Sequence, residues 1–209
     1  MILKKFLNKS NSGGFCKLNY TYGLESNIIK LEFKKLYTHL IIQFYEEGLI
    51  TDIIDLILNR FLLSINDIKE LLKKDTFTEE ENYLLNGLYL NISRVDFDSA
   101  TKISGYMYNV MEYFYDKNRS NILYIDTDII YMKEVVDESF IKSIGIPYKI
   151  SKIENIYFFR QKSYVFEEDY TIKIRGIGKL NSIEEDIVLK MKSDLQSRIR
   201  DEKLDELLN

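Results

Sequence analysis

The alternation of apolar and polar positions divides the chain into short strands and amphipathic helices. Residues 27–33 and 155–166 are rich in β-branched and aromatic side chains, which is typical of strands. Residues 170–176 alternate well enough to pair with the second of these strands as a hairpin. Apolar residues at helical spacing predict helices over 51–63 and about 65–74.

Further helices are predicted from their end residues. Thr78 and Glu81 form a capping box that opens a helix of about 80–92, and Asp98 or Ser99 is expected to cap the next one. One face of that helix carries Ile103, Tyr106, Met107, Val110, Met111 and Phe114, which the helical period assigns to the core.

The C-terminal third of the chain is predicted to contain two more helices. A short helix over 137–143 is expected to end at Gly145, and a charged helix over 182–208 closes the chain. Its expected core contacts are Ile183, Ile187, Leu189, Met191, Leu195 and Ile199. The element order predicts an α+β fold with a mostly antiparallel sheet and helices on one face.

Two apolar runs, 122–125 and 129–132, flank the polar triplet Asp126, Thr127 and Asp128. Such a pattern predicts a β-hairpin with both carboxylates near its tip. Side chains alternate along a strand, so we expect the two carboxylates to lie close together, where a hard cation such as Mg²⁺ relieves their repulsion. The alternative is an ordinary Asp-rich turn; an EF-hand is excluded because the required Gly and closing Glu are missing.

Composition narrows the functional classes. The net charge of −4 provides no overall basic field for nucleic acid, so any such binding must come from local patches. One cysteine, Cys16, excludes an internal disulfide and fits a reducing compartment. The sequence shows neither a membrane-spanning run nor a signal-peptide pattern, so we expect a cytoplasmic protein. The lone His39 lies among apolar residues and is interpreted as structural.

Four segments, in this order, carry a resemblance: EFKKLYTHLI (32–41), NYLLNGLYL (82–90), YIDTDII (124–130) and FRQKSYVF (159–166). They resemble Asp-x-x-Ser-Leu-Tyr-Pro, Lys-x-x-x-Asn-Ser-x-Tyr-Gly, Tyr-x-Asp-Thr-Asp-Ser and the Lys-x-Tyr element in the palm region of family B DNA polymerases. The likeness is nearest to the protein-primed type of phages and linear plasmids, in which Gly13-Gly14-Phe15 also has a counterpart. Four matches in order form a fairly specific signal.

The resemblance implies template-directed nucleotidyl transfer by two Mg²⁺ ions, with Mn²⁺ as a substitute, on DNA and deoxynucleoside triphosphates. It implies Glu32, Asp126 and Asp128 as catalytic residues and metal ligands. It implies a nucleotide site of Tyr37, Asn82, Asn86 and Tyr89, and primer–template contacts from Arg160, Lys162, Tyr164, Lys173 and Arg175. The residues alone leave open that Tyr37 is a core tyrosine and that the basic group is a solvated hairpin face.

The resemblance also implies a domain plan within one compact unit. Residues 1–44 hold an N-terminal strand segment and the first motif, 45–92 reduced helical fingers, 93–180 the palm, and 181–209 a helical thumb remnant. No exonuclease segment is recognised, so no proofreading is expected of this chain. A partner protein is expected to supply missing domains.

The departures from the motifs keep a second function open. Glu32 stands where the family has Asp, Lys35 where it has Ser, and Asn82 where it has the Lys that contacts the triphosphate. These changes point to a weak polymerase or to a degenerate, non-catalytic palm that binds nucleic acid or a protein in a replication or virion complex. An unrelated α+β interaction domain is the third hypothesis.

Overall fold

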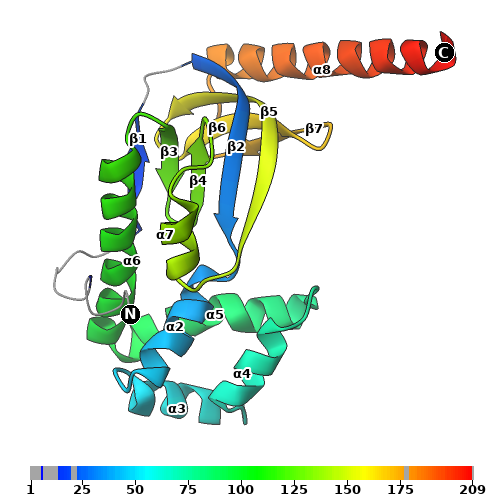
Figure 1. The fold of residues 1–209 in the computed structure, drawn as a ribbon. Coiled ribbons are helices and arrows are strands. Elements are labelled where there is room, and N and C mark those ends of the chain that lie inside the picture. The colour runs from blue at the N-terminus through cyan, green and yellow to red at the C-terminus, as the bar shows by residue number, and fades with distance from the viewer. Residues whose placement is uncertain (1–5, 7–13, 20–22, 177–178, 209) are drawn as a thin grey trace. The chain divides into compact units, whose positions relative to one another are not determined.

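The computed structural model describes residues 6, 14–19, 23–176 and 179–208 (Figure 1). Gly13, the first residue of the Gly13-Gly14-Phe15 segment, lies outside these residues. The chain divides into two compact units. The helical unit comprises Met1–Phe15, Glu32–Asn118 and Asp137–Lys149, and the sheet unit comprises Cys16–Leu31, Arg119–Val136 and Ile150–Asn209.

Seven strands form one sheet, in the order β1-β3-β4-β2-β5-β6-β7 (Figure 1). The pairs β1–β3, β3–β4, β5–β6 and β6–β7 are antiparallel. The strand bounds are β1 Cys16–Leu18, β2 Gly23–Phe33, β3 Ile122–Asp126, β4 Ile129–Met132, β5 Tyr148–Arg160, β6 Ser163–Glu168 and β7 Thr171–Arg175. The predicted α+β class with an antiparallel sheet is confirmed.

The prediction of a single strand over 155–166 is wrong. The segment turns back at Gln161 and Lys162, so that Arg160 on β5 faces Ser163 on β6. Lys162 has a φ of 63°. Strand-like residues on both sides concealed this turn, because Gln161 and Lys162 are not among the usual turn residues Gly, Pro, Asn, Asp and Ser. The predicted pairing of 170–176 with this segment is confirmed, since β7 pairs with β6.

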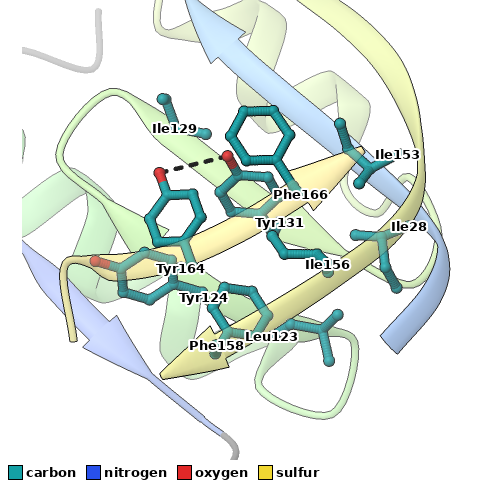
Figure 2. Packing of buried hydrophobic residues seen from close by; sticks show 10 residues of the cluster. All are labelled: Ile28, Leu123, Tyr124, Ile129, Tyr131, Ile153, Ile156, Phe158, Tyr164 and Phe166. Atoms are coloured by element: carbon teal, nitrogen blue, oxygen red, sulfur yellow. Dashed lines mark hydrogen bonds between the residues drawn. The ribbon is translucent and has the colours of Figure 1, made fainter. Parts of the chain in front are cut away.

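One face of the sheet carries a buried cluster dominated by aromatic rings (Figure 2). Tyr124, Tyr131 and Tyr164 are at most 1% exposed. The ring centroid of Tyr164 lies 5.4 Å from that of Tyr124 and 5.4 Å from that of Tyr131, in edge-to-face geometry. Such aromatic pairs contribute about 0.5–1.5 kcal/mol each beyond the area they bury. The cluster therefore packs β3 and β4, which form the Asp-containing hairpin, against β5 and β6, which flank Lys162.

Helix α8 (Ser182–Leu208) packs against the opposite face of the sheet. Phe159 and Val165, which neighbour cluster residues along their strands, contact Val188 and Met191 of the helix. Two predicted core contacts are wrong: Ile183 is 70% and Leu189 62% exposed. Two others, Met191 and Leu195, are confirmed as buried, and Glu184 and Val188 complete the buried face of the helix.

The helical unit contains six helices among its described residues: α2 Leu36–Glu46, α3 Thr51–Asn59, α4 Ile65–Leu72, α5 Glu79–Val95, α6 Phe97–Asn118 and α7 Glu138–Ser143. The capping box of Thr78 and Glu81 is confirmed. The cap predicted for α6 is wrong: the carboxylate of Asp96 accepts hydrogen bonds from the backbone N–H groups of Asp98 and Ser99. The helix therefore begins earlier, at Phe97. No helix in the described ranges is long and apolar enough to cross a membrane.

Candidate functional site

The hairpin of β3 and β4 ends in a strained turn. Asp126 pairs with Ile129, which leaves Thr127 and Asp128 as the loop. The N–H of Asp128 donates to the carbonyl oxygen of Asp126 at 2.6 Å, and Thr127 between them has a φ of 55°. This is a γ-turn of the rare form with positive φ. A β-branched residue in that region is a genuine outlier, and such outliers cluster at functional sites.

The negative charges of both carboxylates raise the pKa of the same buried hydroxyl, that of Tyr164. Burial raises the pKa of Tyr164 to about 12, and the negative charges of Asp126 and Asp128 add to the rise. Asp126 also contributes to the raised pKa values of Tyr124 and Cys16, in both of which burial is the main cause. Within the described ranges, no hydrogen bond or ion pair reaches the side chain of Asp126. The tip thus concentrates negative charge beside the hydroxyl ends of the tyrosine cluster.

The turn between β5 and β6 is hydrogen-bonded to the same hairpin. The backbone N–H of Lys162 donates to the hydroxyl of Tyr124 at 2.8 Å, and that hydroxyl also lies 3.1 Å from the Sγ of Cys16. The side chain of Gln161 donates to the carbonyl oxygen of Cys16 at 2.7 Å. Tyr124, which directly precedes Ile125 and Asp126, therefore links the Lys162 turn to the strand that carries the first carboxylate.

The predicted primer–template residues separate into two groups. Arg160 forms an ion pair with the buried Glu184, and Lys173 forms one with the buried Glu168. Lys162 and Arg175 are exposed, and neither forms an ion pair with any residue that the structure describes. Arg175 faces Tyr164 across β6 and β7, and its charge opposes the rise in the pKa of that tyrosine. Lys162 and Arg175 are therefore the cations of this group that remain open to a phosphate.

Tyr164 lies in the core. Its ring is 1% exposed, and its hydroxyl accepts a hydrogen bond from Tyr131 at 3.4 Å (Figure 2). A nucleic-acid base therefore has no access to the face of this ring. Tyr164, the aromatic residue among the predicted primer–template contacts, therefore packs in the core and supports the strands that carry the site.

The four residues of the predicted nucleotide site come together in the helical unit. The rings of Tyr37 on α2 and Tyr89 on α5 stack with their centroids 4.3 Å apart. The Nζ of Lys35 donates to the Oδ1 of Asn82 at 2.6 Å and to the Oδ1 of Asn86 at 3.1 Å. The segments 35–37 and 82–89, far apart in the sequence, thus form one polar and aromatic group, which we call the Lys35 cluster.

The predicted metal ligands are distributed between the units. Asp126 and Asp128 lie at the hairpin tip of the sheet unit, and the half-buried Glu32 lies on β2 in the helical unit. Carboxylate oxygens are the donors that Mg²⁺ takes, so the side chains of Asp126 and Asp128 offer suitable ligand atoms. Among the residues that the structure describes, no three His, Cys, Asp or Glu side chains form a metal-binding group.

Three contributors to these clusters were not predicted from the sequence. Cys16 and Gln161 brace the Lys162 turn, and Lys35 holds the two asparagines. Only Lys35 had a signal in the sequence, because it departs from the motif that the surrounding residues match. Cys16 lies 108 residues from its partner Tyr124, a separation at which local patterns carry no information.

The fold is similar to that of a DNA polymerase. The family B DNA polymerase from the hyperthermophilic archaeon Pyrobaculum calidifontis matches with a TM-score of 0.52 and 14% sequence identity. The match covers 90% of this chain and 34% of that polymerase, so the chain spans about a third of its length. No protein-family model matches the chain, and no curated protein matches its sequence. The chain has a polymerase-like fold.

Proposed function

We propose that the chain catalyses template-directed transfer of deoxynucleotides to a primer, as a small DNA polymerase of the family B type. The observation that carries this proposal is the position of Asp126 and Asp128. They occupy a strained turn, act together on the Tyr164 hydroxyl, and lie on a hairpin hydrogen-bonded to the Lys162 turn. A purely structural turn has no need of two carboxylates that repel each other.

In this proposal, Asp126 and Asp128 at the hairpin tip hold Mg²⁺, and the resemblance to the first motif implies Glu32 as a further ligand of two such ions. The ions would activate the primer 3′-hydroxyl and neutralise the charge that develops on the leaving phosphates. Other residues of the chain position the DNA and the nucleotide. Lys162 and Arg175 contact backbone phosphates of the primer–template, which gives binding independent of sequence. Asn86 and the stacked Tyr37 and Tyr89 contact the nucleotide.

The assignment to the protein-primed type rests on the order of the four motifs and on the residues that match in each. The partners follow from the same proposal: a primed DNA template, deoxynucleoside triphosphates, and a protein that supplies the remaining domains. Glu32 is one methylene longer than the Asp of the motif. A displacement of about 1 Å in a positioned group can cost on the order of 100-fold in rate, so we expect slow turnover.

Primer extension on a primed DNA template, with Mg²⁺ and separately with Mn²⁺, tests the proposal. The parent chain is expected to extend the primer, and Asp128→Asn is expected to lose about 100-fold or more of the rate. Glu134→Gln is the matched control, because Glu134 is an exposed carboxylate in the same unit.

Absence of extension with both metals, while primer–template binding survives in Asp128→Asn and weakens in Lys162→Ala, would support a non-catalytic nucleic-acid-binding palm instead. The Glu32 and Asn82 departures favour that second function. Equal activity of the parent and Asp128→Asn would place any catalysis elsewhere in the chain.

A further inference from the structure

The Lys35 cluster contains a cation whose hydrogen-bond partners are neutral. The ammonium of Lys35 donates to the amide oxygens of Asn82 and Asn86, at 2.6 and 3.1 Å, and lies 5.2 Å from the centre of the Phe77 ring. No ion pair of Lys35 occurs in the part of the chain that the structure describes. Amide dipoles hold a charge in place but do not cancel it, so the cluster keeps a net positive charge.

The stability of helix α2 does not account for this lysine. Lys35 stands at the N-cap of α2 with a φ of 48°, and its side chain makes no capping hydrogen bond. Ser, Thr, Asp and Asn are the residues that stabilise this position. A cation there opposes the helix dipole, and a non-glycine residue with positive φ is strained. Burial also lowers the pKa of Lys35, which shows that the surroundings disfavour its charge.

The arrangement leaves hydrogen-bond donors open. An ammonium has three N–H donors, of which the two asparagine oxygens accept two. The side-chain amide of Asn86 adds its own N–H groups, for which the described residues provide no acceptor. The third N–H of the ammonium and the amide N–H groups of Asn86 can together bind a phosphate oxygen, because charge-assisted hydrogen bonds are the strong ones.

We propose that Lys35, held by Asn82 and Asn86, is the residue that binds the phosphates of the incoming nucleoside triphosphate. The stacked pair of Tyr37 and Tyr89 lies on the same two segments and offers an apolar surface for the sugar. Where the motif has a lysine, this chain has Asn82, and the cation comes instead from the start of α2. Asn82 is then a positioning residue for Lys35. The identity of the ligand rests on the proposed function; the cation and its partners do not.

Calorimetric titration of the full chain tests the inference. The ligands are an equimolar mixture of the four deoxynucleoside triphosphates, inorganic tripolyphosphate, and a single-stranded oligonucleotide, all at one Mg²⁺ concentration. Lys35→Met removes the charge and keeps most of the aliphatic stem, Lys35→Arg keeps the charge, and Lys34→Met is the control at the adjacent exposed lysine. Far-ultraviolet circular dichroism and a urea midpoint establish that each variant is folded.

Lys35→Met is expected to lower the affinity for the nucleotides and for tripolyphosphate by roughly 10- to 100-fold, which is the effect of losing one charge-assisted hydrogen bond. Lys35→Arg is expected to recover part of the affinity, and Lys34→Met to stay within about twofold of the parent. An unchanged affinity in Lys35→Met, an equal loss in Lys34→Met, or no binding of either phosphate ligand by the parent would overturn the inference. A loss confined to the oligonucleotide would assign Lys35 to the nucleic-acid backbone and also overturn it.

The extension assay separates this inference from the proposed function. If Asp128→Asn abolishes extension while the KM for nucleotide is the same in Lys35→Met and the parent, the polymerase proposal stands and the role of Lys35 is wrong. If the parent shows no extension but binds triphosphate through Lys35, the inference stands and the chain is a nucleotide-binding palm without catalysis.

Discussion

The backbone N–H of Asp128 donates to the carbonyl oxygen of Asp126 at 2.6 Å, with one residue between them, inside the two-residue loop that joins β3 and β4. That residue, Thr127, has a φ of 55°. A two-residue loop is among the shortest connections between antiparallel strands, and it places both carboxylates at the hairpin tip. The strained conformation is the local cost of this placement.

Thr127→Gly is expected to raise the free energy of unfolding by about 0.5–1 kcal/mol, because Gly adopts positive φ without a steric penalty. Urea denaturation at unchanged m-value measures the effect. Thr127→Ala is the control that keeps a Cβ and should gain less. A loss of stability in both variants would show that the threonine side chain, and not its backbone, decides the conformation. In the extension assay, the glycine variant is expected to be slower than the parent, because the carboxylates lose their fixed position.

Lys162 and Arg175 are expected to account for much of the affinity for primer–template. Each alanine substitution should reduce the slope of log Kd against log salt concentration by about 0.9, the value for one phosphate contact on duplex DNA. Fluorescence anisotropy over a range of salt concentrations measures these slopes. Lys152→Ala is the control, since Lys152 is an exposed lysine of β5 in the same unit. An equal change in Lys152→Ala would indicate diffuse electrostatic attraction and no defined contact.

Glu168 is expected to make stability depend on pH between about 4.5 and 2. Burial alone would raise the pKa of this carboxyl, but hydrogen bonds from Lys173, Lys30 and Ser151 outweigh it and lower the pKa to about 2. Because the folded state has the lower pKa, the stabilisation is present above pH 4.5 and is lost as the pH falls toward 2. The shift corresponds to about 3 kcal/mol.

Glu168→Gln should therefore unfold more easily at pH 7, since it removes the ion pairs of Glu168 with Lys30 and Lys173, and should lose less stability than the parent on acidification. Urea denaturation at pH 7, 5 and 3 gives the two curves, with the exposed Glu134→Gln as control. Parallel curves for the parent and Glu168→Gln would show that this carboxyl does not titrate with folding.

Gly176 is expected to tolerate no side chain. A Cβ on this residue would lie 2.9 Å from the Oγ of Ser163 and 3.1 Å from its Cα, and the φ of Gly176 is 148°. Gly176→Ala should cost about 1–3 kcal/mol of unfolding free energy through overpacking and backbone strain. Gly23→Ala, where a Cβ meets nothing within 4 Å, is the matched control on the same sheet. Similar midpoints for the two variants in urea would contradict the close approach of Gly176 to Ser163.

Tyr124→Phe is expected to loosen the Lys162 turn. The substitution removes the acceptor of the Lys162 N–H and the hydroxyl that contacts Cys16, at a cost of about 1–3 kcal/mol if the N–H finds no water. Amide hydrogen exchange should show faster exchange at Lys162 and unchanged protection in α8. Tyr170→Phe, at a tyrosine that is 64% exposed, provides the control. Unchanged exchange at Lys162 would show that the turn is held by its own strands.

Local sequence information predicted those elements whose cause lies within a few residues. The capping box of Thr78 and Glu81 and the Asp-containing hairpin depend on neighbouring backbone groups, and both are confirmed. The α6 cap and the turn at Gln161 and Lys162 were missed, because several adjacent residues could serve as the cap and the turn has no characteristic residue.

The order of apolar runs, polar breaks and helix ends thus determined the α+β class, most elements and the two carboxylates at a hairpin tip. Only the tertiary structure decided that Ile183 and Leu189 of α8 are exposed, that Tyr164 is a core residue, and that Lys35 reaches Asn82 and Asn86. The physical reason is separation along the chain. Backbone preferences and caps act over a few residues, whereas packing and charge pairing join residues tens to more than 100 positions apart, and only the folded chain sets those distances.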